Sequence, residues 1–379
     1  MSNSSLPPTI AATHPLAGQV GGHAGVQTTE DGSLLLKPAL PHEIAFYQQI
    51  AAADDHDALS KLRKWIPKFL GVLKLEGQLK DSNGEGGENV EVVPVQGNMA
   101  PEEKDSLFLS DPAQSLVIEN RLYGFVKPCV LDVKLGTVLY DEDAPPEKKA
   151  RMIKRALDTT SEETGVCLTG FQVYSNNSPK PILIPRSYGK SIKKEQLLEG
   201  VEMFFPVSSA PYPIPSKPQE SSDLETSNLH PGLPPILLHR VLTTLQADLE
   251  ELKTTISSIE MRMVGGSLLI VYEGDWERAS KAVSAPSGTG TTEEDDDEEV
   301  EVEIDENGQI VLESIPDEAT EGEEEPQAPL CSLSLIDFAH TRLTDGAGAD
   351  EGVLKGIQTM IDLVRQRKDK ITAMLPSDR

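Results

Sequence analysis

Apolar residues recur along this chain with two periods, and each period predicts a different kind of secondary structure. Short runs that are continuously or alternately apolar predict strands at 34–37, 116–119, 130–135, 169–174, 267–272 and 331–338. Spacing by three and four residues predicts one helix over 41–62, another over 238–263, and a proline-initiated helix from 145 onward. We therefore expect a fold of mixed α and β structure.

The helix predicted over 238–263 is the longest regular segment. Its apolar side chains step by four and three positions, at Leu238, Leu242, Leu245, Leu249, Leu252, Ile256, Ile259 and Met263. A helix docked on the rest of the protein explains this stripe better than a dimerising coiled coil, because coiled coils sustain the seam over more heptads. We expect Leu249→Asp to disrupt the helix and Thr255→Arg to leave it intact.

Stretches of low complexity interrupt this pattern. They are an amino-terminal tail over 1–15, a Gly- and Asn-rich stretch over 77–105, a proline-rich stretch over 206–235 and an acidic stretch over 283–329. Prolines prevent a continuous helix, and charge repulsion in the acidic stretch predicts disorder. The pieces between these stretches are too short and too unlike to fold alone. We therefore expect insertions within one domain.

One segment supplies most of the formal net charge of −28. Glu293–Glu325 holds 18 Asp and Glu and no Lys or Arg, whereas the rest of the chain has 44 acids against 34 bases. An acidic run repels nucleic-acid phosphates, so we expect no direct nucleic-acid binding. The segment is either a solvated spacer or a contact for basic surfaces of partners such as transcription factors. An anionic substrate needs a locally basic pocket elsewhere.

Composition also limits the compartment and the choice of metal. The chain has no run of 18 apolar residues and no signal-peptide pattern at its start, so we expect a soluble intracellular protein with no transmembrane segment. Cys129, Cys167 and Cys331 lie far apart in apolar runs, which predicts buried thiols. Since no His or Cys spacing suits a transition metal, a catalytic metal is expected to be a hard ion held by carboxylates.

Phosphoryl transfer needs a lysine on the nucleotide phosphates and a carboxylate on a metal ion, and the sequence offers candidates for both. A glycine-rich stretch at 19–25 precedes Lys37 on a predicted strand and Glu43 on a predicted helix, the order found in protein-kinase-like folds. Asp337 follows a strand, where such folds bind Mg²⁺. A cap of the following turn explains Asp337 equally well.

Asp132 and Lys134 lie two residues apart in a predicted strand, so their side chains share one face. An acid and a base presented together suit a catalytic site, but an ion pair on a half-exposed strand has the same pattern. A P-loop is not expected. Gly189-Lys190-Ser191 has the end of that motif, but Ile184 stands where its first glycine is required.

The segment Pro128-x-x-x-Asp132-x-Lys134-x-Gly136 resembles the PxxxDxKxG signature of inositol polyphosphate kinases, and Ser334–His340 resembles that family's SLxIDFAH block. Further matches occur in the same order, at Gln19–Gly25, Leu36-Lys37, Glu43–Tyr47, Ile66–Gly71, Tyr188–Ser191 and Ser267–Gly274. The resemblance spans roughly residues 16 to 363. Leu139–Asp141 followed by Glu147-Lys148 is most like the multikinase branch, particularly its fungal members.

This resemblance implies an α+β, two-lobed, protein-kinase-like fold of the SAICAR-synthase-like type. An ATP-binding N-lobe over 16–119 would carry the insertion at 77–105. A catalytic and inositol phosphate-binding C-lobe over 120–379 would carry the insertions at 206–235 and 283–329.

The resemblance also implies which residues bind the nucleotide. Lys37 would hold the α- and β-phosphates, and Glu43 would orient it. Glu119 and the backbone after it would bind adenine. Asp132 would contact the ribose, and Asp337 would bind Mg²⁺.

For the acceptor, the resemblance implies that Lys134 lies between the γ-phosphate and the reacting hydroxyl, so that Lys134, Asp132 and Asp337 form the catalytic set. Lys148, Arg151 and His340 would bind the inositol phosphates. Arg151 stands where animal members commonly have glutamine.

The expected activity is phosphorylation of inositol 1,4,5-trisphosphate by ATP and Mg²⁺ to the tetrakis- and then the pentakisphosphate. An inositol hexakisphosphate kinase or an inositol trisphosphate 3-kinase of the same family is the alternative. A transcriptional scaffold acting through residues 293–325 is an alternative of another class. We expect the protein in the nucleus and cytoplasm.

Overall fold

The computed structural model describes residues 13–16, 25–74, 114–208, 231–284, 303–304, 310–311 and 329–376. The stretch predicted over 77–105 lies outside the described residues, as does most of the tail and of the proline-rich and acidic stretches. The disorder expected for them stays a prediction. No helix of the described part combines the length and apolar character needed to span a bilayer.

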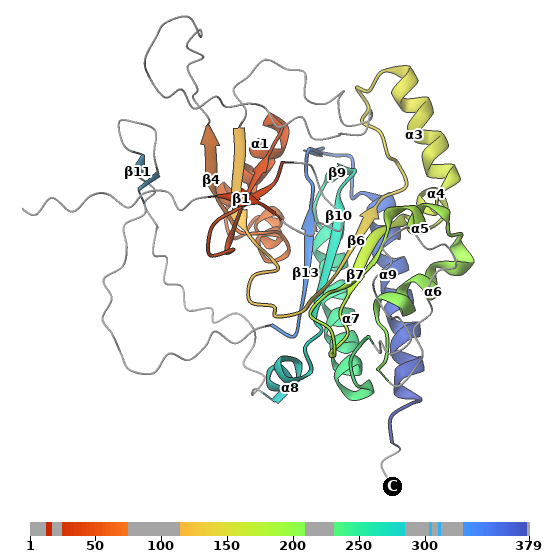
Figure 1. Cartoon of the computed structure of the whole chain (residues 1–379). Helices are drawn as coiled ribbons and strands as arrows, with labels where there is room; N and C mark the ends of the chain where they lie inside the picture. Colours follow the sequence, from red (N-terminus) through yellow and green to blue (C-terminus); the bar gives the residue numbers. More distant parts are fainter. Residues whose placement is uncertain are drawn as a thin grey trace, which may run out of the picture.

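The amino-terminal part of the chain forms a five-stranded antiparallel sheet in the order β1-β2-β3-β5-β4 (Figure 1). Its strands are β1 His14–Pro15, β2 Gln27–Thr28, β3 Leu34–Pro38, β4 Phe69–Lys74 and β5 Gln114–Glu119. The strands predicted at 34–37 and 116–119 are thus confirmed. Two helices follow β3, namely α1 Pro41–Ala52 and the 3₁₀ helix η1 Ala58–Trp65.

The prediction of one helix over 41–62 was wrong, because the chain breaks between α1 and η1. Helix η1 begins after Asp57, whose carboxylate accepts a hydrogen bond from Leu59 N at 2.9 Å. An aspartate that caps a new helix start competes with continuation of the preceding helix. Arg63 holds the bend by donating to Ile50 O at 3.2 Å.

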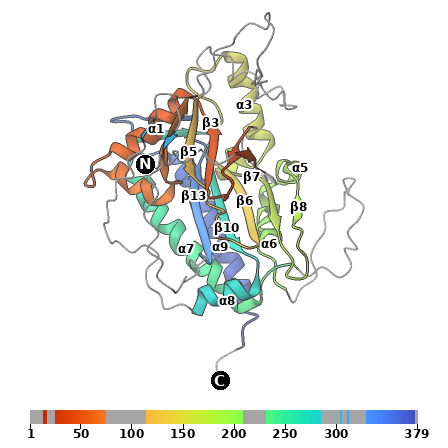
Figure 2. The same ribbon diagram turned by 60° about the vertical axis from the view of Figure 1, so that its left-hand side comes forward.

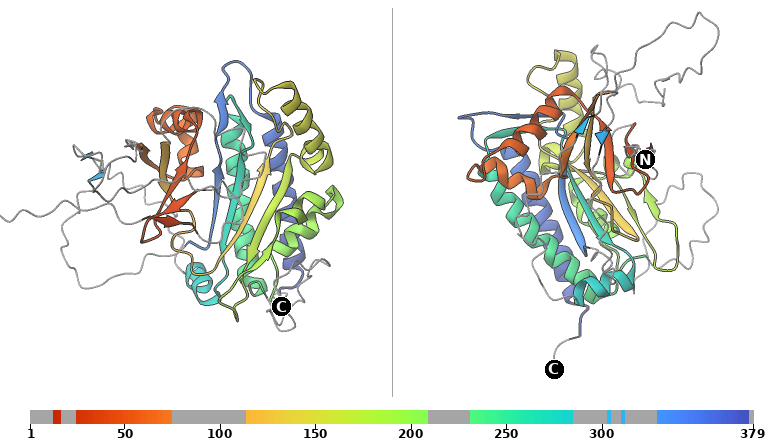
Figure 3. Two further views of the ribbon diagram at one scale, coloured as in Figure 1. Left: turned by 45° about the horizontal axis from the view of Figure 1, so that its top comes forward. Right: turned by 90° about the vertical axis from the view of Figure 1, so that its left-hand side faces the viewer.

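A second five-stranded antiparallel sheet has the order β13-β10-β6-β7-β8. Its strands are β6 Pro128–Leu135, β7 Val166–Val173, β8 Ile182–Ile184, β10 Ser267–Glu273 and β13 Cys331–Ile336. Neighbours β10 and β13 are separated by 57 residues of sequence. Figures 1 and 3 show β13 as the strand on the side of the first sheet, so its carboxyl end lies where the two sheets approach.

Two long helices, α7 Pro235–Ser257 and α9 Glu351–Thr372, run side by side along one face of the second sheet (Figures 2 and 3). That face is apolar. Leu131, Val133 and Leu135 of β6 are fully buried in the core shared with these helices. The alternation of a strand therefore turns Asp132 and Lys134 to the opposite face.

Shorter elements complete the second half of the chain. They are α3 Pro146–Asp158, α4 Ser161–Thr164, α5 Arg186–Ser191, η2 Lys194–Gln196, α6 Leu197–Phe204, α8 Trp276–Ser284 and the strand pairs β9 Met261–Val264 with β14 His340–Leu343 and β11 Glu303–Ile304 with β12 Ile310–Val311. Helix α3 stands at the top of Figure 1, beyond the end of β6.

The helix predicted over 238–263 is α7, but it ends at Ser257. The hydroxyls of Ser257 and Ser258 turn back to Thr254 O and Thr255 O, both at 2.7 Å, and so satisfy carbonyls that a longer helix would use. The apolar stripe nevertheless continues beyond the helix, because Met263 is buried in β9. Periodicity alone did not reveal this change of structure.

Two further predictions need correction. Thr255 is buried, and its hydroxyl bonds to Glu251 O, so Thr255→Arg would not be tolerated. Cys129 and Cys167 are buried as predicted, but Cys331 is only partly buried.

Truncating Leu249 tests the packing of α7. Because the side chain is fully buried in the core, Leu249→Ala should lower the free energy of unfolding by about 3 kcal/mol through lost burial and a new cavity. Thr254→Ala, on the exposed face of the same helix, should change it by less than about 0.5 kcal/mol. Urea unfolding followed by circular dichroism measures both, and equal effects would contradict the docking of this helix.

Candidate active site

Asp337 is the centre of a buried ionic cluster that joins the two sheets. Lys37, in β3 of the first sheet, places Nζ 2.9 Å from Asp337 Oδ1 and 2.7 Å from Glu43 Oε1 in α1. Lys134, in β6 of the second sheet, places Nζ 2.8 Å from Asp337 Oδ2. Each oxygen of the carboxylate therefore faces a different lysine, and the residues predicted from three separate motifs meet at one point.

The backbone around Asp337 is held in an uncommon conformation. Asp337 has φ of 67°, in the left-handed region that aspartate tolerates better than most residues. The next residue, Phe338, is fully buried, with ring centroids 5.0 Å from Phe46 and 5.5 Å from Tyr47, both in α1. Phe338 N also donates to Glu43 Oε1 at 3.1 Å. Helix α1 thus fixes both the lysine partner and the turn that carries the carboxylate.

The cluster keeps both lysines charged. Burial alone would lower the pKa of Lys37, but the carboxylates of Asp337 and Glu43 raise it above its ordinary value. Burial likewise opposes the charge of Lys134, and Asp337 and Asp132 reverse the effect, so that the pKa of Lys134 is also raised. The lysine side chains therefore present fixed positive charge at neutral pH.

Asp132 lies beside this cluster with an unsatisfied carboxylate oxygen. The residue is 3% exposed, and its Oδ1 makes no hydrogen bond of standard geometry within the described part of the chain. Burial raises the pKa of Asp132, Lys134 counteracts this, and Asp337 adds to it. An unpaired buried acceptor is costly, so this oxygen is suited to a ligand that brings a donor.

Gly136, which ends the PxxxDxKxG signature, allows the backbone to turn after β6. Gly136 follows β6 with φ of 98°, a region that residues with a Cβ rarely adopt. Its N–H donates to Gly165 O at 2.8 Å, which turns the chain away immediately after Lys134. Lys134 Nζ also donates to Gly265 O at 2.9 Å, which adds a second anchor for the ammonium group.

Of the three residues predicted to bind the acceptor, His340 and Lys148 lie near each other. His340 begins β14, and Lys148 of α3 is close enough to lower its pKa, although burial is the larger cause. Asp141 Oδ2 lies 3.5 Å from His340 Nδ1 and partly opposes that shift. Arg151 is exposed one turn along α3 from Lys148, and among the described residues no hydrogen bond or ion pair ties it to the others.

The two remaining predictions concern adenine and the glycine-rich stretch. Glu119 ends β5, and its carboxylate is engaged by Arg121 at 3.2 Å and by Lys68 N at 3.2 Å. Its side chain therefore serves the protein, and its own N–H is used as well, donating to Lys68 O at 3.0 Å. Of the stretch 19–25, residues 19–24 lie outside the described part, and only Gly25 is seen, with φ of 88°.

Comparison with known proteins decides what this site belongs to. The family model described as inositol polyphosphate kinase matches residues 115–365, more than half of the chain. The inositol polyphosphate multikinase of Saccharomyces cerevisiae is 31% identical over 94% of this chain and 98% of its own length. The chain belongs to the inositol polyphosphate kinase family. It is therefore a kinase that transfers a phosphoryl group from ATP.

Other members of the family are similar over a smaller part of the chain. The human inositol polyphosphate multikinase is 29% identical over 50% of this chain and 40% of its own length. Human inositol hexakisphosphate kinase 1 is 25% identical over 67% of this chain and 53% of its own length. The crystal structure of the S. cerevisiae multikinase, in complex with ADP and Mn²⁺, has a TM-score of 0.54 at 26% identity and covers 89% of this chain and 99% of that one. The predicted α+β inositol polyphosphate kinase fold is thus confirmed.

The family implies a divalent metal ion beside the nucleotide. The ionic cluster fits a metal ion that is bound partly by a protein carboxylate and partly by the phosphates of the nucleotide. The described residues contain no group of three or more His, Cys, Asp or Glu that could enclose an ion. Mg²⁺ commonly takes one or two carboxylates and completes its shell with water and nucleotide phosphates. The carboxylate of Asp337, between two lysines that also attract phosphate, fits this donor set.

Sequence motifs missed several side-chain contacts around this site. Asp141 is shared by His340 and by Arg342, whose Nη1 lies 2.8 Å from Asp141 Oδ1. Arg121 donates to Ser334 in the strand that leads to Asp337. The partners in these contacts lie about 200 residues apart in sequence, so no local pattern predicts them.

Replacing Asp132 separates stability from function. Because its pKa is raised above the ordinary 3.8 in the folded protein, the native state binds the proton more tightly, and the charged form costs stability in full above the raised pKa. Asp132→Asn should therefore raise the melting temperature at pH 7 while weakening ADP binding. The gain should shrink as the pH falls towards 3.8. If Asp132→Asn lowered the melting temperature equally at pH 7 and near pH 3.8, the buried Asp132 carboxylate would not be the source of instability inferred here.

Proposed function

We propose that this kinase is a multikinase that converts inositol 1,4,5-trisphosphate to the tetrakisphosphate and then to the pentakisphosphate. The observation that carries the proposal is the chain of contacts from Lys37 through Asp337 to Lys134, with Lys148 and His340 beside it. The lysines of this chain of contacts would bind the phosphates of ATP on one side of the Asp337 carboxylate and those of the inositol phosphate on the other. The S. cerevisiae relative that is similar over 94% of this chain is also a multikinase.

The nucleotide would lie between the two sheets. Lys37 would contact the α- and β-phosphates, and its bond to Glu43 keeps the ammonium group aimed inward. The unpaired Oδ1 of Asp132 would accept a hydrogen bond from a ribose hydroxyl, which removes the cost of its burial. The main chain after Glu119 would bind adenine. Asp337 would hold Mg²⁺, which neutralises phosphate charge when bound.

Lys134 would act as a fixed cation between donor and acceptor. The carboxylates of Asp337 and Asp132 raise its pKa, so a role as a fixed cation suits it better than a role as general base. A loose phosphoryl-transfer transition state needs charge stabilisation and alignment more than proton abstraction. About one third of the Lys134 side chain is exposed, so it can reach substrate from within the cluster.

Three residues would recognise the inositol phosphates. Lys148 offers a point charge and Arg151 a two-pronged donor, and both chemistries suit phosphate. His340 has a lowered pKa, so its neutral ring would donate or accept a hydrogen bond, with Asp141 fixing the ring. Since Arg151 is exposed and replaces a common glutamine, it is the first residue to test for acceptor preference.

An inositol hexakisphosphate kinase or an inositol trisphosphate 3-kinase is the alternative within the family. The similarity to a human hexakisphosphate kinase over two thirds of the chain favours keeping the first of these under test. Parallel assays with inositol 1,4,5-trisphosphate and inositol hexakisphosphate as acceptors, followed by chromatography of the labelled products, decide between them. Consumption of only the hexakisphosphate would overturn the multikinase proposal.

Removing the central cations and carboxylate should abolish turnover. With ATP, Mg²⁺ and labelled inositol trisphosphate, Lys134→Ala and Asp337→Ala should each lower kcat about 10²-fold or more. Lys194→Ala, which breaks only the surface pair with Glu163, should retain wild-type kcat. Circular dichroism checks that all variants are folded. Activity of the folded Lys134→Ala protein within threefold of wild type would contradict the mechanism.

A second proposal concerns partners. We infer from the charge of Glu293–Glu325 that this segment contacts basic surfaces of transcription factors and that the protein acts in the nucleus as well as the cytoplasm. Such a role would accompany kinase activity and would use different residues. The strength of such contacts would fall with ionic strength.

Deleting residues 293–325 tests this second proposal. Nuclear partners recovered with the full-length protein should be lost from the deletion variant, whereas kinase activity should change by less than about twofold, because the site lies in other residues. A variant with the same length in which the acids become Gln and Asn separates charge from length. Retention of every nuclear partner by both variants would sink the scaffold role.

A further inference from the structure

Residues 120–127 connect the two sheets, and the proposed adenine-binding backbone lies at their start. Asn120 ties the segment to the first sheet, because its N–H donates to Ser33 O at 2.8 Å and its side-chain amide to Gly32 O at 2.7 Å. The rest of the segment is held by the second sheet through Arg121 and Glu273. A connection between lobes is thus clamped at both ends in this protein.

Arg121 forms the first clamp on the second sheet. Its Nε donates to Ser334 Oγ at 2.8 Å and its Nη2 to Ser332 Oγ at 3.1 Å, while Nη1 lies 3.2 Å from a Glu119 carboxylate oxygen. Both serines belong to β13, and Ser334 is three residues before Asp337. The guanidinium therefore joins the proposed adenine site to the strand that delivers the metal-binding carboxylate.

The register of the sheet shows where this contact falls. Ser334 is opposite Leu269, and Leu269 is opposite Asp132, so all three side chains share one face. Two strand spacings separate Ser334 from Asp132, which is about 10 Å. Arg121 thus reaches the same face and the same row as the residue proposed to contact ribose.

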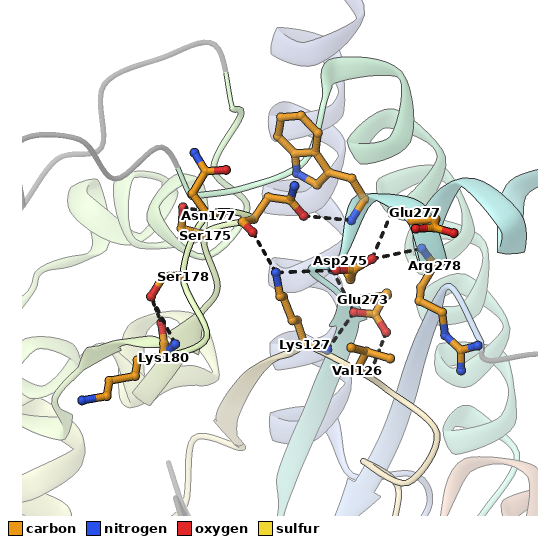
Figure 4. Close-up of polar contacts among 12 residues, drawn as sticks. Val126, Lys127, Ser175, Asn177, Ser178, Lys180, Glu273, Asp275, Glu277 and Arg278 are labelled. Carbon is orange, nitrogen blue, oxygen red and sulfur yellow. Dashed lines mark hydrogen bonds and ion pairs between the residues drawn. The ribbon is translucent and has the colours of Figure 1, made fainter.

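Glu273 forms the second clamp, at the other end of the segment. This carboxylate is 1% exposed and accepts hydrogen bonds from Val126 N at 2.8 Å, Lys127 N at 2.9 Å and Asp275 N at 2.9 Å. Figure 4 shows Glu273 facing the backbone at Val126 and Lys127, with Asp275 beside the Lys127 side chain. The Lys127 side chain donates to Asn176 O at 2.9 Å and lies 3.5 Å from Asp275. Backbone N–H groups bonded to a buried carboxylate fix the path of the chain.

We propose that Arg121 and Glu273 are positioning residues for the nucleotide, holding the adenine-binding segment at a set distance from Asp337 and Asp132. Neither residue contacts the substrate in this arrangement. Loss of either clamp lets the segment move relative to the carboxylates, so adenine and the phosphates no longer bind together at full strength. The acceptor side, with Lys148 and His340, does not depend on the clamps. This inference rests on the proposed adenine site.

Nucleotide binding to the full-length protein tests the proposal. By calorimetry with ADP and Mn²⁺, Arg121→Met and Glu273→Gln should each weaken ADP binding about tenfold. Ser334→Ala should weaken it by a smaller factor, because it removes only one of the contacts of Arg121. Arg121→Lys should recover part of the affinity, because a lysine reaches one serine. Arg365→Met, in an exposed pair on α9, should bind ADP as wild type does.

Kinetics separate positioning from a general loss of structure. In Arg121→Met and Glu273→Gln, KM for ATP should rise about tenfold, while KM for the inositol phosphate stays within about twofold and kcat recovers at saturating ATP. Unchanged ADP affinity in both variants, or a parallel rise in both KM values, would overturn the inference. If the wild-type protein binds ADP but phosphorylates no inositol phosphate, the proposed function fails, and the ADP measurements still decide the role of the clamps.

Discussion

The carboxylate of Asp337, shared between Lys37 and Lys134, is the interaction on which the rest of the active site depends. Charges removed from water are tolerated only when each has a partner at close range. The cluster therefore requires that the two sheets approach at one place, with β3 and the end of β13 within bonding distance. The packing of the Phe338 ring against α1 and the hydrogen bond from Phe338 N to Glu43 hold the two sheets together at the same place. The contacts that hold the two sheets together are therefore the same ones that arrange the candidate active site.

The cluster is held together by the chain's own side chains. Its lysines are charged, oriented and partly shielded from solvent, so little reorganisation is needed as charge develops on a transferring phosphoryl group. The Oδ1 atom of Asp132 has the opposite effect on stability. A buried acceptor without a hydrogen bond destabilises the folded protein, and the same atom is available to a ligand. Asp141 extends the same logic to the acceptor side by holding His340 and Arg342 together.

The sequence predicted the chemical parts better than their connections. The signature around Asp132 and Lys134 and the order of Lys37 and Asp337 indicated a phosphoryl-transfer site through their resemblance to a family pattern. Spacing alone left a surface ion pair and a turn cap as equal explanations. The contact of Arg121 with Ser334 spans 213 positions and leaves no local pattern. The end of α7 was missed for a related reason, since burial of Met263 in a strand continues an apolar spacing that began in a helix. Tertiary pairing decided these features.

The neighbouring strands β10 and β13 are consecutive in the sheet but 57 residues apart in sequence. The entropy of closing such a connection grows only with the logarithm of its length, and each doubling costs about 0.6 kcal/mol. The strand that delivers Asp337 therefore tolerates long additions before it, provided that its own pairing with β10 is kept. That connection can therefore be lengthened or change its charge at a small cost in free energy, and a new interaction can be gained there without moving the Asp337 carboxylate.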